Sequence, residues 1–272
     1  MVPAPVNAIR LLLSDVDGTL VTPDKMLTSQ TVDAVGQLRD AGILVAIASA
    51  RPAQGLTMFV EPLGLTTPLA ALNGGLIVDE DLRVLRRHDI AADLVPSIIE
   101  TLRARGLSVW LYRGLDWFVL DQNGPHVAHE ARSCRFAPTQ LASFDGVADD
   151  VTKVVGVSDD HVANRDALAA LHDDFGPRII ATPSQSYYLD VTHPRATKGD
   201  VVRFVAERYA IAPDAIATIG DMPNDVSMFA ASGLSIAMGN ADLAVQRAAD
   251  YVTSANDEEG FANAVRSFIL ST

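Results

Sequence analysis

The most informative stretch of this chain is Leu11-Leu12-Leu13-Ser14-Asp15-Val16-Asp17-Gly18-Thr19-Leu20-Val21, where an apolar run leads directly into two carboxylates, a glycine and a hydroxyl. The apolar run predicts a buried strand. Residues two apart on a strand point to the same face, about 6.6 Å apart, so Asp15 and Asp17 both face a ligand at the strand's carboxyl end. Gly18 lets the backbone turn sharply. Paired carboxylates suit a hard cation such as Mg2+, and a carboxylate can attack phosphorus, so the stretch predicts a phosphate site.

Short apolar runs alternate with amphipathic segments on both sides of the middle of the chain. This alternation predicts an α/β fold with a doubly wound, mainly parallel, Rossmann-like core sheet. The expected strands lie near 9–14, 43–48, 69–72, 215–219, 234–237 and 250–252. The expected helices lie near 29–41, 53–60, 199–209, 223–232, 241–248 and 258–269.

Between these two halves the pattern changes to hairpin-like strands and longer helices, which is typical of an α+β insert. The expected strands lie near 76–78, 82–87, 107–112, 115–120, 152–158, 178–182 and 186–191. The expected helices lie near 93–105 and 161–174. The simplest organisation is therefore a core made of residues 1–75 and 191–272, with an inserted cap domain at 76–190.

Composition limits the classes of protein. The 272 residues are 49% hydrophobic and 20% charged, which is enough for one large or two modest domains with buried cores. A formal net charge of −13 argues against nucleic acid as a partner. No apolar run approaches the roughly 18 residues of a membrane span, and the first ten residues lack a signal-peptide pattern. The single cysteine, Cys134, fits a reducing cytoplasm, and we expect a soluble monomer or weak homo-oligomer.

Four polar segments follow the expected strand ends of the core, where open α/β sheets bind ligands. The first is the Asp15/Asp17 pair. In the second, Ser49-Ala50-Arg51, a hydroxyl and an arginine precede a helix start that can donate to phosphate oxygens. The third, Thr197-Lys198-Gly199, places a lysine at a helix start, where it can neutralise phosphoryl charge. The fourth, Gly220-Asp221-Met222-Pro223-Asn224-Asp225, supplies further oxygen ligands for a metal.

Taken in order, these segments resemble the four motifs of the haloacid dehalogenase superfamily of phosphohydrolases. Asp15-Val16-Asp17-Gly18-Thr19 resembles the signature DxDGT. The position of the insert between the second and third motifs, together with its α+β pattern, resembles the Cof-like subfamily with a type II α/β cap.

The resemblance implies a role for each matching residue. Asp15 corresponds to the nucleophile, Asp17 to the general acid and then base, and Ser49 and Lys198 to groups that stabilise the phosphate and the intermediate. The implied cofactor is Mg2+, held by Asp15, Asp17, Asp221 and Asp225, with Asp17 contributing its backbone carbonyl.

Substrate contacts are also implied by the resemblance. Asn73-Gly74-Gly75 resembles the family's turn near the substrate, Arg51 the residue that faces the ester, and Asn224 a member of the acidic loop that contacts substrate. Arg195 stands where relatives often have glycine. It either adds positive charge to the site or points to solvent.

Several other residues are expected on the surface or in the interior and not in the chemistry of the site. Lys25 is expected on a loop surface, and His126-Val127-Ala128-His129-Glu130 matches no zinc-helix pattern. Tyr187, Tyr188, Asp190 and His193 lie where the cap rejoins the core, and alternation predicts that about half of them are packed away from substrate. Trp110, Tyr112, Trp117 and Phe118 are expected in the core of the cap.

The predicted function is a Mg2+-dependent phosphomonoester hydrolase that acts on a small phosphorylated metabolite, first of all a sugar phosphate, through an aspartyl phosphate on Asp15. A phosphotransferase or phosphomutase that uses the same aspartate is the alternative. A non-catalytic phosphate sensor is the remaining hypothesis, but it has no need of Asp15, Asp17 and the acidic loop together.

Overall fold

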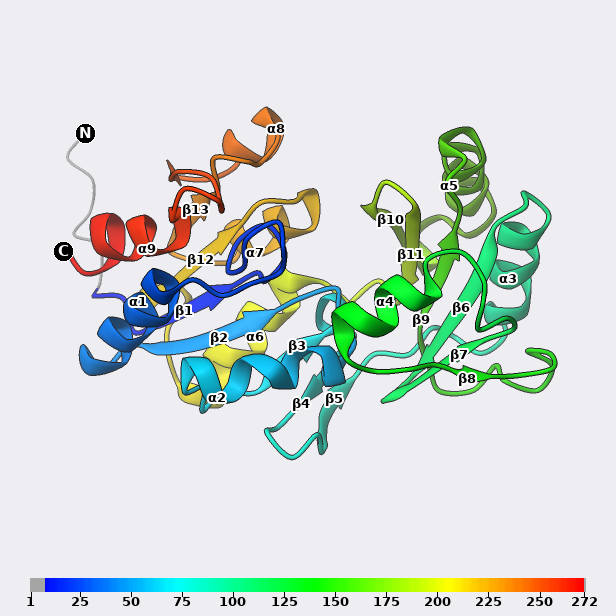
Figure 1. Ribbon diagram of the computed structural model, residues 1–272, viewed down its shortest axis with the longest axis horizontal. Coiled ribbons are helices and arrows are strands. Elements are labelled where there is room, and N and C mark those ends of the chain that lie inside the picture. Colours follow the sequence, from blue (N-terminus) through cyan, green and yellow to red (C-terminus); the bar gives the residue numbers. More distant parts are fainter. Residues whose placement is uncertain (1–7, 272) are drawn as a thin grey trace.

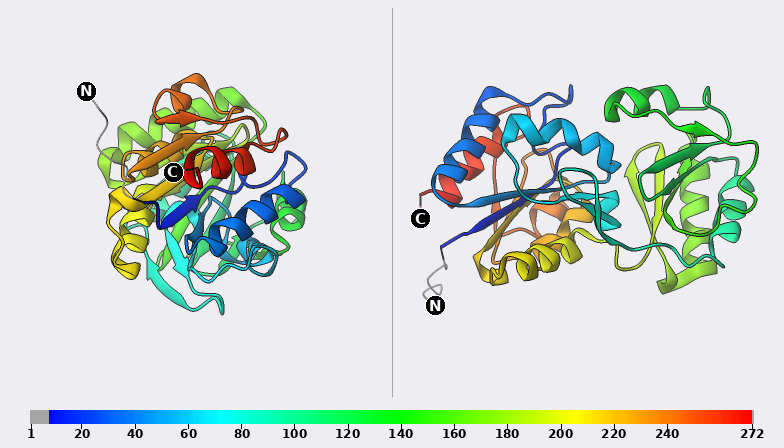
Figure 2. Two further views of the ribbon diagram at one scale, coloured as in Figure 1. Left: turned by 90° about the vertical axis from the view of Figure 1, so that its left-hand side faces the viewer. Right: turned by 90° about the horizontal axis from the view of Figure 1, so that it is seen from below.

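Two β-sheets organise the computed structural model, which describes residues 8–271 (Figure 1). The core sheet has eight strands in the order β14-β13-β12-β1-β2-β3-β4-β5, and the cap sheet has six in the order β10-β11-β9-β6-β7-β8. The view from below in Figure 2 shows the two bodies side by side, joined by connecting segments. Residues 1–7, part of the region without a signal-peptide pattern, and Thr272 lie outside the described residues.

The centre of the core sheet is parallel, as predicted, and β1 pairs with β2 on one side and with β12 on the other. The hairpin β4–β5 adds two antiparallel strands at one edge. The strands of the core sheet are β1 Leu11–Ser14, β2 Leu44–Ala48, β3 Leu69–Ala71, β4 Leu76–Val78, β5 Val84–Arg87, β12 Ile216–Gly220, β13 Leu234–Ala237 and β14 Tyr251–Val252.

Helices cover both faces of the core sheet because its strands are apolar on both sides. Leu12 of β1 packs in the cluster that holds α1 and α9, whereas Leu11 and Leu13 pack in the cluster that holds α6 and α7. The core helices are α1 Ser29–Asp40, α2 Val60–Leu63, α6 Lys198–Tyr209, α7 Val226–Phe229, α8 Leu243–Gln246 and α9 Gly260–Ala264.

Three predicted helices are shorter or less regular than expected. The helix near 53–60 is a 3-10 helix over Ala53–Phe59 that continues into α2, and the helix near 223–232 begins as a 3-10 turn over Pro223–Asp225 before α7. The last helix, α9, continues as a π-helix over Val265–Ile269. Local propensity does not distinguish these tighter or wider turns from an α-helix, because the apolar spacing is nearly the same.

The cap sheet separates two apolar layers. Helices α3 and α5 pack on one face with Leu111 and Val154, and α4 packs on the other with Trp110 and Trp117. The sequence did not predict α4, although it placed the cap aromatic residues correctly in the interior. The cap elements are α3 Val95–Arg103, β6 Ser108–Arg113, β7 Asp116–Val119, α4 Val127–Cys134, β8 Thr139–Gln140, β9 Val151–Val157, α5 His161–Phe175, β10 Ile180–Gln185 and β11 Tyr188–Thr192.

The boundary expected at residue 76 is wrong for the hairpin β4–β5. These strands continue the core sheet through the pairing of β3 with β4, whereas β11 at the other crossing belongs to the cap sheet as far as Thr192. A hairpin pattern shows that two strands pair with each other but does not show which sheet edge they extend. We propose 8–87 and 193–271 as the core and 88–192 as the cap.

Within residues 8–271 there is no helix whose length and apolar character would allow it to cross a bilayer.

Candidate active site

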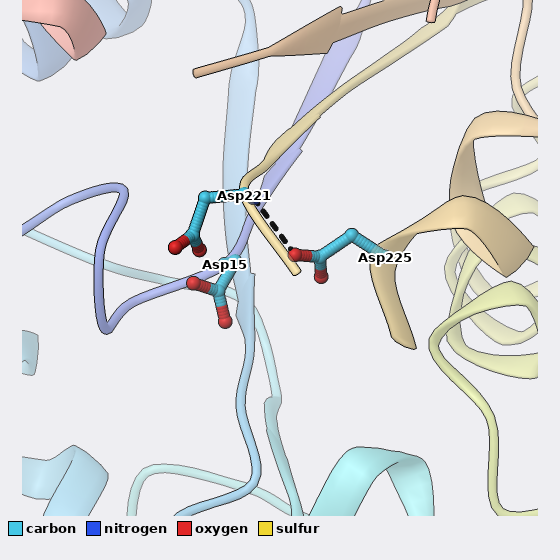
Figure 3. Close-up of side chains that lie close together, drawn as sticks. All are labelled: Asp15, Asp221 and Asp225. Carbon is cyan, nitrogen blue, oxygen red and sulfur yellow. Dashed lines mark hydrogen bonds between the residues drawn. The ribbon is translucent and has the colours of Figure 1, made fainter. Parts of the chain in front are cut away.

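Three carboxylates converge at the carboxyl ends of β1 and β12, as Figure 3 shows. Asp15 follows β1, Asp221 follows β12, and Asp225 ends the short turn after it. One carboxylate oxygen from each residue lies within 4.8 Å of those of the other two, and all three residues are buried. The doubly wound sheet thus brings together groups that are about two hundred residues apart in the chain.

Lys198, the first residue of α6, lies beneath this cluster with 1% of its surface exposed. Its Nζ is 2.5 Å from Asp15 Oδ1 and 2.5 Å from Asp225 Oδ1. Burial alone would lower the pKa of Lys198, but the two carboxylates hold it above its usual range. Lys198 is therefore a permanent cation beside the Asp15 carboxylate.

Asp15 has one free oxygen. Its Oδ1 accepts from Lys198, whereas its buried Oδ2 has no hydrogen-bond partner among the described residues. Burial raises the pKa of Asp15 to about 6, with Lys198 acting in the opposite direction. A buried carboxylate oxygen without a partner is costly in a folded protein, and it is the arrangement expected of a group that binds a cation or attacks a substrate.

Asp221 and Asp225 differ in how their oxygens are used. Asp225 Oδ2 accepts from the backbone N–H groups of Asp221 and Met222 at 2.9 and 2.8 Å, so this carboxylate holds the acidic loop in shape. Asp221 accepts from Thr19 Oγ1 and Asn240 Nδ2, each at 3.2 Å. Burial raises the pKa of Asp221 to about 8, and the adjacent carboxylates act in the same direction.

Gly18 permits the close approach of the first and fourth segments. Its φ of +84° lies in the left-handed region, and a Cβ at this position would collide with the Asp221 carboxylate. Only glycine satisfies both conditions without displacing a proposed metal ligand.

The Asp17 carboxylate points away from the cluster, toward two cations. Arg51 Nε and Nη2 lie 2.6 and 2.8 Å from its two oxygens, and Lys25 Nζ lies 2.8 Å from Oδ1. Burial alone would raise the pKa of Asp17, but Arg51 and Lys25 lower it to about 2. Asp17 is therefore ionised in this state, and its carboxylate takes no part in the three-carboxylate cluster.

A cavity of about 310 Å³ opens beside these groups, between core and cap. Of the sequence-predicted residues, the core contributes Asp15, Asp17, Ser49, Arg51 and Asn224 to its lining. The cap contributes Glu130, Lys153, Tyr187 and Tyr188, among others. The structure thus brings the first, second and fourth segments to one cavity, with Lys198 of the third directly behind Asp15.

Three predicted substrate residues do not line the cavity. Asn73 Oδ1 accepts from Asn224 Nδ2 at 2.9 Å and so supports the acidic loop from behind. A Cβ on Gly74 would press on Val201 and the Thr197 carbonyl, which gives this glycine a packing role. The Arg195 side chain is 66% exposed and lies 4.0 Å from Asp200, so of the two alternatives for this residue it points to solvent.

The sequence reading missed Lys25, Glu130 and Lys153. Lys25 was expected on a loop surface, but a turn closed by its N–H bond to the Thr22 carbonyl directs it onto Asp17. The only local signal is the Pro23-Asp24 turn that precedes it. Nothing local places Glu130 or Lys153 at the site, because both reach it by packing of the cap against the core.

Comparison with known proteins agrees with this geometry. Residues 12–265 match the family of haloacid dehalogenase-like hydrolases. Pyridoxal phosphate phosphatase YbhA of Escherichia coli is 27% identical over 96% of this chain and 99% of its own length. The Bacillus subtilis 5-amino-6-(5-phospho-D-ribitylamino)uracil phosphatase YitU is 25% identical over 95% of this chain and 97% of its own.

Among solved structures, a haloacid dehalogenase-like hydrolase from Bacteroides thetaiotaomicron superposes with a TM-score of 0.83. It is 27% identical, and the match covers 95% of this chain and 98% of that one. The chain therefore belongs to the haloacid dehalogenase-like hydrolases, and the resemblance to their Cof-like group is confirmed.

Proposed function

We propose that this phosphatase is a Mg2+-dependent phosphomonoester hydrolase that forms an aspartyl phosphate on Asp15. Membership of the hydrolase family and the phosphatase names of its relatives support the reaction class. The observation that carries the mechanism is the unpartnered, buried Oδ2 of Asp15 beside Lys198. This oxygen has no donor among residues 8–271, so it is available to phosphorus.

The donor set supports Mg2+ as the cofactor. Three buried carboxylates lie close enough to share one ion, and burial together with repulsion between the carboxylates raises the pKa values of Asp15 and Asp221. An oxygen-only set suits a hard cation. We assign the ion to Asp15, Asp221 and the Asp17 carbonyl, with Asp225 holding the loop. When bound, it neutralises charge on the phosphoryl group and its nucleophile.

In the first step, Asp15 Oδ2 attacks phosphorus in line and the bond from phosphorus to the leaving oxygen breaks. Asp17 gives its proton to that oxygen, and an alcohol departs. In the second step, Asp17 takes a proton from water, whose oxygen attacks phosphorus and releases inorganic phosphate and the Asp15 carboxylate. Lys198 and Ser49 offset the phosphoryl charge throughout.

Proton donation requires a change at Asp17, because Arg51 and Lys25 hold it ionised in the present state. The substrate phosphate offers both cations a new acceptor. Their transfer from Asp17 to the phosphate would allow the carboxyl group to be protonated as the leaving group arrives.

The cavity favours a small substrate. Its volume of about 310 Å³ lies at the low end of the usual range for small-molecule sites. Pyridoxal phosphate and the ribitylaminouracil phosphate named for relatives are both compact phosphate esters. A small phosphorylated metabolite, first of all a sugar phosphate, is the substrate that this cavity volume and these relatives support.

We also propose a cytoplasmic location for the chain, and its single cysteine, the buried Cys134, accords with that location.

The test is release of inorganic phosphate from a panel of phosphate esters. Mg2+ should support release, and excess chelator should abolish it. Ca2+ should bind and inhibit, because its longer and less regular oxygen contacts disturb the in-line geometry. Full activity in chelator would contradict the metal assignment. Transfer of the phosphoryl group to a second alcohol in place of water would identify a phosphotransferase instead.

A further inference from the structure

We propose that Glu130 and Lys153 of the cap form a subsite for hydroxyl groups of the leaving alcohol, so that the preferred substrates are polyhydroxylated phosphate monoesters. This inference rests on the proposed hydrolase function. It adds two cap residues that would contact the leaving alcohol, and it distinguishes one class of leaving group from its competitors.

Glu130 is held as an acceptor in the wall of the cavity. It lies on α4, the cap helix that faces the core (Figure 1). Its Oε1 accepts from Cys134 Sγ at 3.2 Å and its Oε2 from the Tyr188 hydroxyl at 3.4 Å. Burial, and then the Glu130 charge, raise the pKa of both donors above their usual values, so both keep their protons.

This carboxylate has capacity left for a ligand. Two oxygens offer about four acceptor positions, and one protein donor occupies a position on each oxygen. Glu130 is only half-buried and lines the cavity, so its remaining acceptor positions are accessible to a ligand there.

Lys153 presents the complementary donor. It lies on β9, is 5% exposed and still lines the cavity. Its Nζ donates to Asp190 Oδ2 at 2.7 Å and to the Ala50 carbonyl at 3.2 Å. An ammonium has three N–H groups, so one donor remains for a ligand. The Ala50 contact places this donor directly beside the second polar segment, next to Ser49 and Arg51.

A hydroxyl is the group that fits both residues. A hydroxyl can donate to Glu130 or accept from Lys153, so neighbouring hydroxyls on one carbon chain can bind the two residues. An ammonium satisfies Glu130 but is repelled by Lys153, and a carboxylate has the opposite problem. A site with one acceptor and one donor therefore favours sugar and polyol phosphates over amino-alkyl or carboxylated phosphate esters.

The experiment compares kcat/KM for four esters in Mg2+: glucose 6-phosphate, O-phosphoethanolamine, phosphoglycolate and p-nitrophenyl phosphate. The wild-type enzyme should prefer the hexose phosphate to the amino and carboxylated esters. Glu130→Gln should lower the ratio of kcat/KM for the hexose phosphate to that for the aryl phosphate by about 10- to 100-fold, since a hydrogen bond to a charged group is lost. Glu100→Gln is the matched control, because Glu100 is exposed on α3 at the opposite face of the cap.

Lys153 requires a paired substitution, since Lys153→Met alone leaves the buried Asp190 without its cation. The double variant Lys153→Met/Asp190→Asn should lower the same ratio, and thermal melting verifies that it folds. An unchanged ratio in Glu130→Gln, or a wild-type preference for the amino or carboxylated ester, would overturn the subsite while leaving the hydrolase intact. Absence of phosphate release from every ester would instead remove the proposed function itself.

Discussion

At the scale of single residues, the site depends on the different surroundings of two similar carboxylates. Asp15 is buried beside Lys198 and has one oxygen without a partner among the described residues. Asp17 instead forms ion pairs with Arg51 and Lys25. The pKa of Asp15 is raised and that of Asp17 is lowered. The two positions of one short motif can therefore carry different chemical roles, because their surroundings and not their identity set their charge.

We expect Asp15→Asn to abolish turnover while the fold is retained. The amide is nearly isosteric but cannot form an acyl phosphate, so kcat should fall by roughly a thousandfold or more. Phosphate release in Mg2+ measures the loss, and circular dichroism verifies the fold. Asp33→Asn, on the exposed side of α1, should behave as wild type. Near wild-type turnover by folded Asp15→Asn would remove the nucleophile assignment.

The acid role of Asp17 predicts a dependence on the leaving group. In Asp17→Asn, alkyl phosphates, which need a proton on departure, should lose about tenfold or more activity beyond the loss for p-nitrophenyl phosphate. The comparison is kcat/KM for each ester in variant and wild type, with Asp24→Asn on the adjacent exposed loop as control. Equal losses for good and poor leaving groups would count against proton donation by Asp17.

At the scale of elements, α6 connects the site to the edge hairpin and to the crossing into the cap. Asp200 in its first turn accepts from Arg86 of β5 at 2.7 Å and lies 3.0 Å from His88 Nε2. Thr197 caps the helix by accepting from the Asp200 backbone N–H. Since Lys198 begins the same helix, these contacts hold the lysine where it meets Asp15.

Asp200→Asn should therefore destabilise the fold in a pH-dependent way. Burial alone would raise the pKa of Asp200, but His88, Arg86 and Arg203 lower it from 3.8. A lowered pKa means that the stabilisation is complete above pH 3.8 and is lost as pH falls through the folded-state value. We expect a deficit of about 1–3 kcal/mol in the free energy of unfolding near neutral pH.

Urea unfolding from pH 3 to 8 measures this difference between the variant and the wild type. The difference in free energy of unfolding between variant and wild type should become smaller below about pH 4. There the Asp200 carboxylate is protonated first in the unfolded chain and then in the folded one. Asp40→Asn, exposed at the end of α1, serves as control. A gap that stays constant down to pH 3 would show that charge on Asp200 is not the source of the stabilisation.

At the scale of the whole molecule, core and cap meet through side chains of one body that donate to backbone carbonyls of the other. Arg51 Nη1 donates to Ser133 of α4 at 3.2 Å, Lys153 donates to Ala50, and Gln54 Nε2 donates to Leu115. The rings of His88 and His193, one on each crossing between the two bodies, stack with centroids 5.5 Å apart. The cap therefore contacts the core at several points around the site in this structure.

Gln54→Ala should shift the cap toward more open arrangements, because it removes one of these links without touching the cluster of carboxylates. Spin labels at the exposed positions Asp33 in the core and Asp166 in the cap report the distance between the two bodies. Without ligand the distance distribution should broaden toward longer values, and the KM for a metabolite phosphate should rise. Gln37→Ala is the control. Identical distributions in variant and wild type would show that this link does not hold the cap.

The sequence by itself determined the order of the strands and helices in the core and the positions of the polar segments at their ends. Both are local properties: apolar periodicity marks a buried parallel strand, and residues such as Asp15, Ser49 and Asp221 follow it directly. Since parallel strands end at one edge of a sheet, the convergence of these segments could be predicted without coordinates.

Only the tertiary structure decided which surfaces meet. It assigned β4–β5 to the core sheet, turned Lys25 onto Asp17 and left Arg195 in solvent. It also brought Glu130 and Lys153 of the cap to the cavity. Each of these outcomes depends on pairing and packing between segments distant in the chain. Local spacing carries no information about such partners, because the same hairpin, loop or short helix is compatible with several neighbours.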